Sequence, residues 1–85
     1  MHEYHIVDAL VKQVVAKAAE HKASSVAVVH LAMAHDSGLD SGSIRLYFSQ
    51  IAAGTSCADA ALVFETFERV SADTPALYIK DIEVE

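Results

Sequence analysis

The sequence contains very little cysteine, proline or glycine, and no tryptophan. Its single cysteine, Cys57, excludes an internal disulfide and any zinc site built from paired CxxC motifs. One proline and three glycines among 85 residues, of which 53% are hydrophobic and 21% charged, exclude a disordered or low-complexity chain. We therefore expect one folded domain over residues 1–85, with a modest core.

Long apolar runs and clustered positive charge are also missing. No apolar run approaches the roughly 20 residues that cross a bilayer. The N-terminal segment does not resemble a signal peptide, because Asp8, Lys12 and Gln13 interrupt its apolar residues. Six scattered Lys and Arg residues stand against twelve Asp and Glu, a formal charge of −6, which disfavours nucleic-acid binding. These absences predict a cytoplasmic protein that binds neither membrane nor nucleic acid.

Helical periodicity is clearest over residues 4–22, where apolar side chains recur on one face. This stripe consists of Ile6, Val7, Leu10, Val11, Val14, Val15, Ala18 and Ala19. Residues 25–34 are short, rich in β-branched side chains and apolar at both alternating sets of positions. That pattern predicts a central strand.

Residues 35–40 are turn-forming, and Asp40 or Ser41 can cap a second helix. Its inward side chains would be Ile44, Tyr47, Phe48 and Ile51, and Gly54 is placed to end it in the left-handed conformation. Two more strands are expected over residues 60–69 and 76–84, joined by a connection of hairpin length at residues 70–75. A phase change in the apolar pattern predicts a bulge near Lys80 and Asp81.

The expected order of elements is α-β-α-β-β. A strand–helix–strand crossover makes the first two strands parallel, and the third strand adds antiparallel. Both helices can then cover one face of the sheet. We predict a two-layer α/β (α+β) sandwich with a three-stranded mixed sheet.

The N-terminus carries the chemistry that stands out. The amine of Met1, the backbone amide nitrogen of His2 and its imidazole can close a five-membered and a six-membered chelate ring around one ion. Ni(II) and Cu(II) favour such square-planar nitrogen sets. Glu3 could add a carboxylate oxygen or hydrogen-bond the imidazole. Alternatively, His2 and Glu3 are only the frayed start of the first helix, with Glu3 stabilising the helix dipole.

The remaining candidates are weaker. His5 could approach a metal at the N-terminus or lie exposed on the helix, and His35 could be an accessory ligand or a surface-loop residue. His30 lies within an apolar strand and is expected to be hydrogen-bonded and partly buried. Cys57 lacks the partner residues of a catalytic nucleophile, and phosphate-loop and nucleophile-elbow motifs are absent, so we do not expect an enzyme.

Four segments follow one another along the chain: MHEYHIVDALV with its alanine-rich helix, HKASSVAVVHLAMA, DSGLDSGSIRLYFSQIAAGTS and the closing KDIEVE. Together they resemble the HypA/HybF family of hydrogenase nickel-insertion proteins. The family pattern runs from Met-His-Glu through a helix and a valine-rich strand to a Ser-Gly segment before the second helix, with Gly-Thr after it. Met-His-Glu at the N-terminus is its most specific part.

The resemblance implies a nickel site on His2 and Glu3. The amine of Met1 joins this predicted ligand set through the chelate argument above. Some members add an acidic residue before the second helix, and Asp40 matches that position. Asp40 has an alternative role as the N-cap of the second helix. The implied partners are a HypB-type GTPase and a hydrogenase large-subunit precursor, with ligand exchange rather than catalysis as the mechanism.

One departure from the family pattern is large. Family members carry a zinc module with paired CxxC motifs between the last two strands, where this chain has only VSADTP at residues 70–75. We therefore expect Ni(II) and no zinc. The missing module leaves a second interpretation open, in which the chain is an interaction module that has lost metal delivery. Its sheet edges could pair with another chain or form a homodimer.

Overall fold

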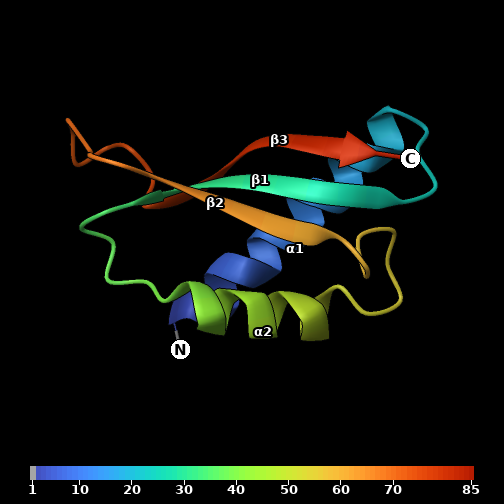
Figure 1. The fold of residues 1–85 in the computed structure, drawn as a ribbon, viewed down its shortest axis with the longest axis horizontal. Coiled ribbons are helices and arrows are strands. Elements are labelled where there is room, and N and C mark those ends of the chain that lie inside the picture. The colour runs from blue at the N-terminus through green and yellow to red at the C-terminus, as the bar shows by residue number, and fades with distance from the viewer. Residues whose placement is uncertain (1) are drawn as a thin grey trace.

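The computed structural model describes residues 2–85, and side chains from residue 3 onward. Figure 1 shows α1 (His2–Glu20), β1 (Val26–Ala34), α2 (Ser41–Ile51), β2 (Ala61–Phe67) and β3 (Leu77–Val84). The predicted order of elements is confirmed. The first helix begins and ends two residues earlier than predicted, which brings Glu3 into its first turn. No helix within residues 2–85 is long and apolar enough to cross a membrane.

The strand with two apolar faces is the central one, as its pattern predicts. The sheet order is β2-β1-β3, with β1 parallel to β2 and antiparallel to β3. The short connection between β2 and β3 is not a hairpin, because these strands are not neighbours. It passes the end of β1, where the Ala34 N–H donates to the Ala76 carbonyl at 2.8 Å. A connection as short as that of a hairpin is therefore long enough to cross the end of one strand and reach the far side of the sheet.

The bulge predicted in the last strand is confirmed. His30 pairs with Asp81 and Leu31 with Ile79, so Lys80 has no partner on β1. Lys80 forms an ion pair with Glu65 of β2, which reaches across the central strand. This ion pair raises the pKa of Lys80 and lowers that of Glu65, because the hydrogen bond between them favours both charged forms.

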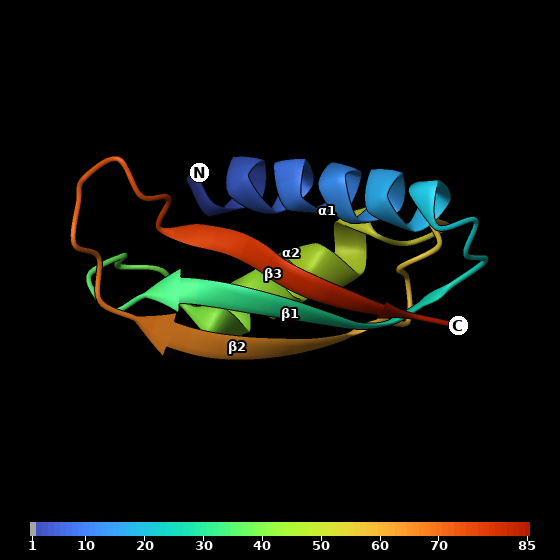
Figure 2. The same cartoon turned by 90° about the horizontal axis from the view of Figure 1, so that it is seen from above.

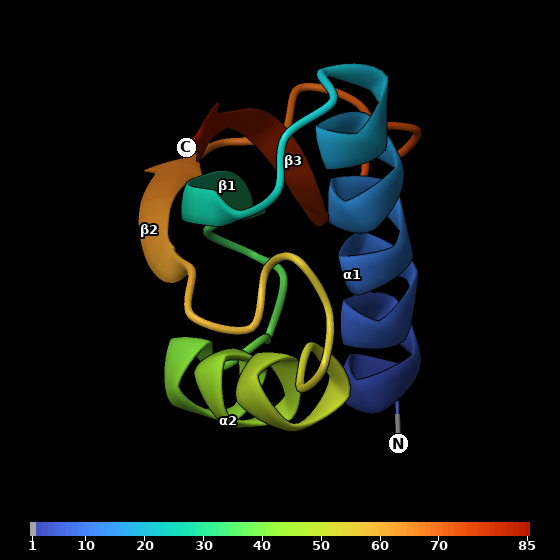
Figure 3. The same cartoon turned by 90° about the vertical axis from the view of Figure 1, so that its right-hand side faces the viewer.

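Both helices lie on one face of the sheet, as predicted (Figures 2 and 3). The core between the layers joins apolar side chains of all five elements. Its fully buried members include Val7, Val14, Val29, Leu31 and Ile44. Burial of each such side chain stabilises the fold by roughly 1.5–3 kcal/mol. Ala19 is expected on the buried stripe but is exposed, whereas Ala18 beside it is only 1% exposed, so the buried stripe of α1 is narrower than predicted.

A residue in the left-handed conformation follows each helix. After α1, Lys22 has φ 56°, and the Ala23 N–H reaches back to the Ala18 carbonyl at 3.0 Å. This is the Schellman arrangement, in which glycine is the usual residue. Gly54 has φ 81°, so its predicted left-handed conformation is confirmed. It does not end α2, however, because the helix stops at Ile51 and its C-cap is Ala52, which is right-handed (φ −76°, ψ −9°).

Candidate metal centre

Four residues were predicted to hold a metal: Met1, His2, Glu3 and Asp40. Met1 and the His2 side chain lie outside the part of the chain that the structure describes. The other two residues are together, since the Asp40 N–H donates to Oε2 of Glu3 at 3.0 Å. The first turn of α1 is thus joined to the residue that precedes α2, as the neighbouring ends of the two helices in Figure 1 indicate. Thirty-seven positions separate the pair in sequence.

Asp40 is the N-cap of α2. Its backbone is extended (φ −110°, ψ 121°), and its Oδ2 accepts hydrogen bonds from Ser43. The Ser43 N–H lies at 3.1 Å and the Ser43 hydroxyl at 3.0 Å. Hydrogen bonding from the Ser43 N–H and then from its hydroxyl holds the pKa of the Asp40 carboxyl below its usual value. The capping interpretation is confirmed, and a ligand role stays a prediction.

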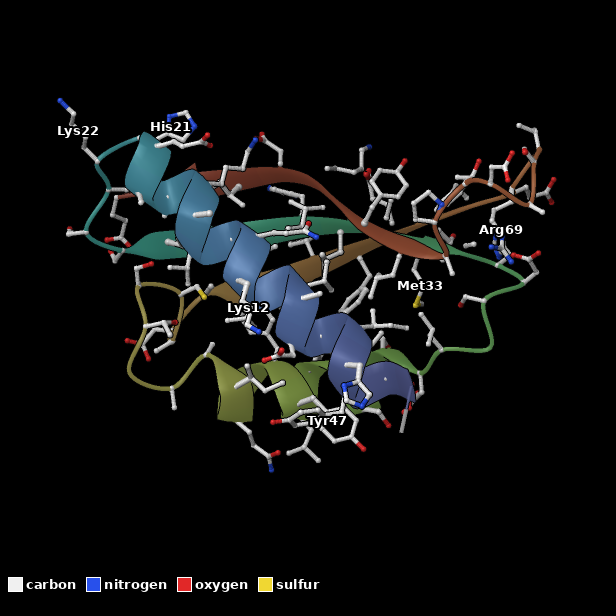
Figure 4. The ribbon with its side chains drawn as sticks, turned by 180° about the vertical axis from the view of Figure 1, so that it is seen from behind. Lys12, His21, Lys22, Met33, Tyr47 and Arg69 are labelled. Atoms are coloured by element: carbon white, nitrogen blue, oxygen red, sulfur yellow. The ribbon has the colours of Figure 1, made fainter. Side chains whose placement is uncertain are left out.

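An aromatic contact fixes the first turn of α1 against α2. The rings of Tyr4 and Tyr47 meet edge to face, with 5.8 Å between their centroids. Figure 4 shows Tyr47 on α2 beside the beginning of α1. His5 is exposed and lies edge-on to Tyr4 at 6.0 Å. This position agrees with the prediction that His5 lies exposed on the helix, and it does not support a role as a metal ligand.

The loop that leads to Asp40 is held at its other end by Arg69. The guanidinium donates to both oxygens of Asp36, at 3.1 and 3.3 Å, and to the Thr74 carbonyl at 3.2 Å. The Arg69 hydrogen bond lowers the pKa of the Asp36 carboxyl. Figure 4 shows Arg69 at the end of the sheet, near the start of the segment that leads from β1 to α2. The segment before α2 is therefore fixed at Asp36 and again at Asp40.

The other histidines lie away from the N-terminus. His30 is half-buried and its Nε2 is 2.6 Å from a carboxylate oxygen of Glu83, which confirms a hydrogen-bonded, partly buried residue. His35 is exposed and lines a small hollow with Asp36, Glu68 and Arg69. Among the residues whose side chains are described, no three His, Cys, Asp or Glu residues lie close enough to hold a metal ion.

Cys57 is fully buried in the core. Its exposed fraction is 0%, and its Sγ lies 3.2 Å from the hydroxyl oxygen of Thr55. A thiol sealed in the core has no access to a substrate. Cys57 is a packing residue on these grounds.

Periodicity placed Tyr47 on the inward face of the second helix, but it did not predict the contact with Tyr4. The pairing of Arg69 with Asp36 was not predicted either, because these residues are remote in the sequence and no local pattern indicates such a pairing. The turn composition of residues 35–40 was the only available signal for this region. A loop between a central strand and a capped helix must begin at one end of the sheet. The sequence does not indicate which residues hold such a loop in place.

Comparisons with known proteins agree with this geometry. A model of the family described as hydrogenase/urease nickel incorporation, metallochaperone, hypA matches residues 1–72. The solution structure of the Ni metallochaperone HypA from Helicobacter pylori superposes with a TM-score of 0.80 at 15% identity, covering 96% of each chain. A second HypA solution structure gives a TM-score of 0.74 at 17% identity, covering 100% of this chain and 97% of the other. At these identities the structures establish the fold alone. No curated protein matches significantly.

Proposed function

Because this chain belongs to the HypA family of hydrogenase/urease nickel-incorporation metallochaperones, we propose that it carries one Ni(II) ion in the cytoplasm. The ion is cargo and is released to a recipient, so no reaction is catalysed. The observation that carries the proposal is the family match over residues 1–72, which contains every predicted ligand. The hydrogen bond between Asp40 and Glu3 supports it, because it gathers two oxygen-bearing residues at the start of α1.

The proposed ligands are nitrogen atoms of the chain terminus. The amine of Met1, the backbone amide nitrogen of His2 and the His2 imidazole form linked chelate rings, which suit the square-planar preference of Ni(II). Binding displaces protons from the amine and the amide, so the affinity rises with pH. The same exchange allows release, because protonation of the amine and the amide nitrogen lowers the affinity of the site for the ion.

Glu3 and Asp40 supply the acidic part of the proposed site. One oxygen of Glu3 accepts the Asp40 N–H, and Oδ2 of Asp40 caps α2. Each carboxylate therefore has a structural partner already, and each has a second oxygen with which to approach a cation. Ligand and anchoring roles are compatible for both residues.

The proposed recipients follow the family. A HypB-type GTPase and a hydrogenase large-subunit precursor would accept nickel by ligand exchange. The single cysteine leaves no paired CxxC zinc site within these 85 residues. Nickel binding and nickel delivery are therefore separate claims for this chain, and they need separate tests.

Nickel titration of the untagged protein tests the binding claim. We expect one equivalent of Ni(II), with visible d–d bands typical of nitrogen ligation. His2→Ala should weaken the affinity by at least tenfold, and acetylation of the Met1 amine should do the same, because it converts the amine into an amide and supplies no new amine. His5→Ala is the matched control, since it removes an imidazole three positions away. If the acetylated protein binds as the wild type does, the amine does not coordinate.

Delivery is tested with the same variants. Transfer of nickel from the loaded protein to a purified HypB-type GTPase should require His2, whereas physical association of the two proteins should not. A wild-type chain that binds the GTPase but no nickel would establish the alternative, an interaction module without a metal.

A further inference from the structure

The outer edge of β2 is an open sheet edge. The Phe67 carbonyl accepts the His35 N–H and so faces β1, whereas the Leu62 carbonyl accepts Nη1 of Arg45 at 3.0 Å on the other side. Backbone groups alternate sides along a strand, so Leu62, Phe64 and Thr66 turn their N–H and C=O groups outward. Among the described residues, Arg45 is the only one that hydrogen-bonds to this edge.

The opposite edge is protected. Strand β3 carries the bulge at Lys80, which disrupts a regular ladder, and helix α1 runs alongside it (Figure 3). Bulges and covering helices are the usual means by which proteins block strand addition. Strand β2 contains neither proline nor glycine, pairs with β1 over seven consecutive residues without a register shift, and lies on the side of the sheet away from α1. The sheet is therefore open to addition on one side.

Charge around this edge favours a basic occupant. Exposed carboxylates stand at the two ends of β2, on Asp59 and Glu68, and neither takes part in an ion pair among the described residues. Between them the exposed apolar residue Val63 lies on the uncovered face of the sheet. Residues 58–85 hold seven of the twelve acidic residues and only two of the six cations. A second copy of the chain, with the same charge of −6, would meet this surface with repulsion.

Arg45 occupies the point where an added strand would begin to pair. Its guanidinium lies over the Phe64 ring, 4.9 Å from the centroid, while Nη1 holds the Leu62 carbonyl. An incoming strand would need the same carbonyl for its own N–H. Arg45 thus competes with strand addition, and its positive charge disfavours a basic segment at close range.

We propose that the outer edge of β2 is a docking site at which an extended, basic segment of a partner protein adds as a fourth strand. Main-chain hydrogen bonds to Phe64 and Thr66 supply the affinity, and basic side chains at the two ends of the segment pair with Asp59 and Glu68. Nine steps separate these carboxylates, and at roughly 3.3 Å per residue they span at most about 30 Å, because Asp59 lies in the turn before β2. A segment of up to about ten extended residues is therefore long enough to reach both. Arg45 competes with the added segment for the Leu62 carbonyl and so lowers the affinity of the edge for that segment.

Two synthetic peptides test the proposal on the full chain without metal. Both are capped decapeptides that alternate valine and threonine; one has a lysine at each end and the other a glutamate. Amide hydrogen exchange locates binding, and calorimetry measures it at two salt concentrations. The lysine peptide should slow exchange at Phe64 and Thr66 about tenfold when it is present at about ten times its Kd. It should bind several-fold more tightly than the glutamate peptide, with the difference shrinking at high salt.

Variants and a modified peptide separate the contributions. Arg45→Ala should tighten the binding of both peptides several-fold. The pair Asp59→Asn and Glu68→Gln should remove the preference for lysine. Thr66→Pro should abolish binding, because it deletes an outward N–H, and a peptide N-methylated on alternate residues should fail equally without any change to the protein. Binding that protects residues of β3 instead, survives N-methylation, or ignores the terminal charge would overturn the proposal. So would a self-associated chain, detected by sedimentation, whose dimer already protects Phe64 and Thr66.

Discussion

The backbone N–H of Asp40 donates to the side chain of Glu3 at 3.0 Å, and this bond joins the first turn of α1 to the N-cap of α2. The two acidic residues predicted from the sequence as metal ligands are therefore neighbours before any metal arrives. Asp40 also caps α2 through Ser43, so a displacement of the Glu3 side chain would act on the first residues of the second helix. The first turn of α1 is thus joined to the start of α2 by this hydrogen bond and by the contact between Tyr4 and Tyr47.

Substitutions at Glu3 can separate anchoring from ligation. Glu3→Gln keeps an oxygen that accepts the Asp40 N–H, whereas Glu3→Ala leaves that N–H without its partner. If Glu3 acts mainly as an anchor, we expect Glu3→Gln to bind nickel within about threefold of wild type and Glu3→Ala about tenfold more weakly, a loss of about 1.4 kcal/mol. Calorimetric titration measures both. Equal losses in the two variants would assign the Glu3 carboxylate to the metal itself.

Lys22 offers a stabilising substitution remote from the metal centre. Its φ of 56° places a side chain in the left-handed region, where Cβ meets the following carbonyl oxygen. Lys22→Gly should raise the free energy of unfolding by roughly 0.5–1 kcal/mol, since glycine adopts this conformation without strain. Urea denaturation at pH 7 measures it. Lys22→Ala, which also removes the charge but keeps the Cβ, should give no comparable gain.

The sequence predicted those features that depend on the periodicity of a single segment. The stripe from Val7 to Ala18 gave the first helix, the two apolar faces around Val29 gave the central strand, and the slip at Lys80 gave the bulge. Capping by Asp40 also followed from local chemistry. In each case the physical cause lies within a few residues of its effect, so one sequence is sufficient to see it.

Pairings between remote segments could not be predicted in the same way. Nothing in residues 70–75 indicates that the connection steps over β1, because a loop of that length also suits a hairpin. The contacts of Glu3 with Asp40, Arg69 with Asp36, and Arg45 with Leu62 join residues whose chemistry suits many partners. Their selection depends on how the two layers pack. The nickel ligands Met1 and His2 remain predictions from chelate chemistry and from the family pattern.

The ion pair of Asp36 and Arg69 predicts a defined pH dependence. The hydrogen bond from Arg69 lowers the pKa of folded Asp36 below its ordinary value of 3.8. A lowered pKa means that the carboxylate stabilises the fold above pH 3.8 and loses this contribution as the pH falls through the folded pKa. Asp36→Asn should therefore lower the urea midpoint at pH 7, and this deficit should shrink as the pH is lowered below 3.8. The exposed Asp59→Asn is the control and should have little effect across the same pH range. A constant Asp36→Asn deficit would mean that the loop is held by shape and not by charge.

The burial of Cys57 makes the thiol a reporter of the whole fold. With an exposed fraction of 0%, it should react with an alkylating reagent only when the chain opens, so the labelling rate follows the population of open molecules. A ligand at one hundred times its Kd stabilises the native state by about 2.7 kcal/mol, which corresponds to about a hundredfold slower labelling. We expect Ni(II) to slow labelling of the wild type to this extent and to leave His2→Ala unchanged. Mg(II) is the control for non-specific ionic effects. Rapid labelling of the metal-free wild type would show that Cys57 is reached by local motion, and equal slowing of His2→Ala would place the nickel elsewhere in the chain.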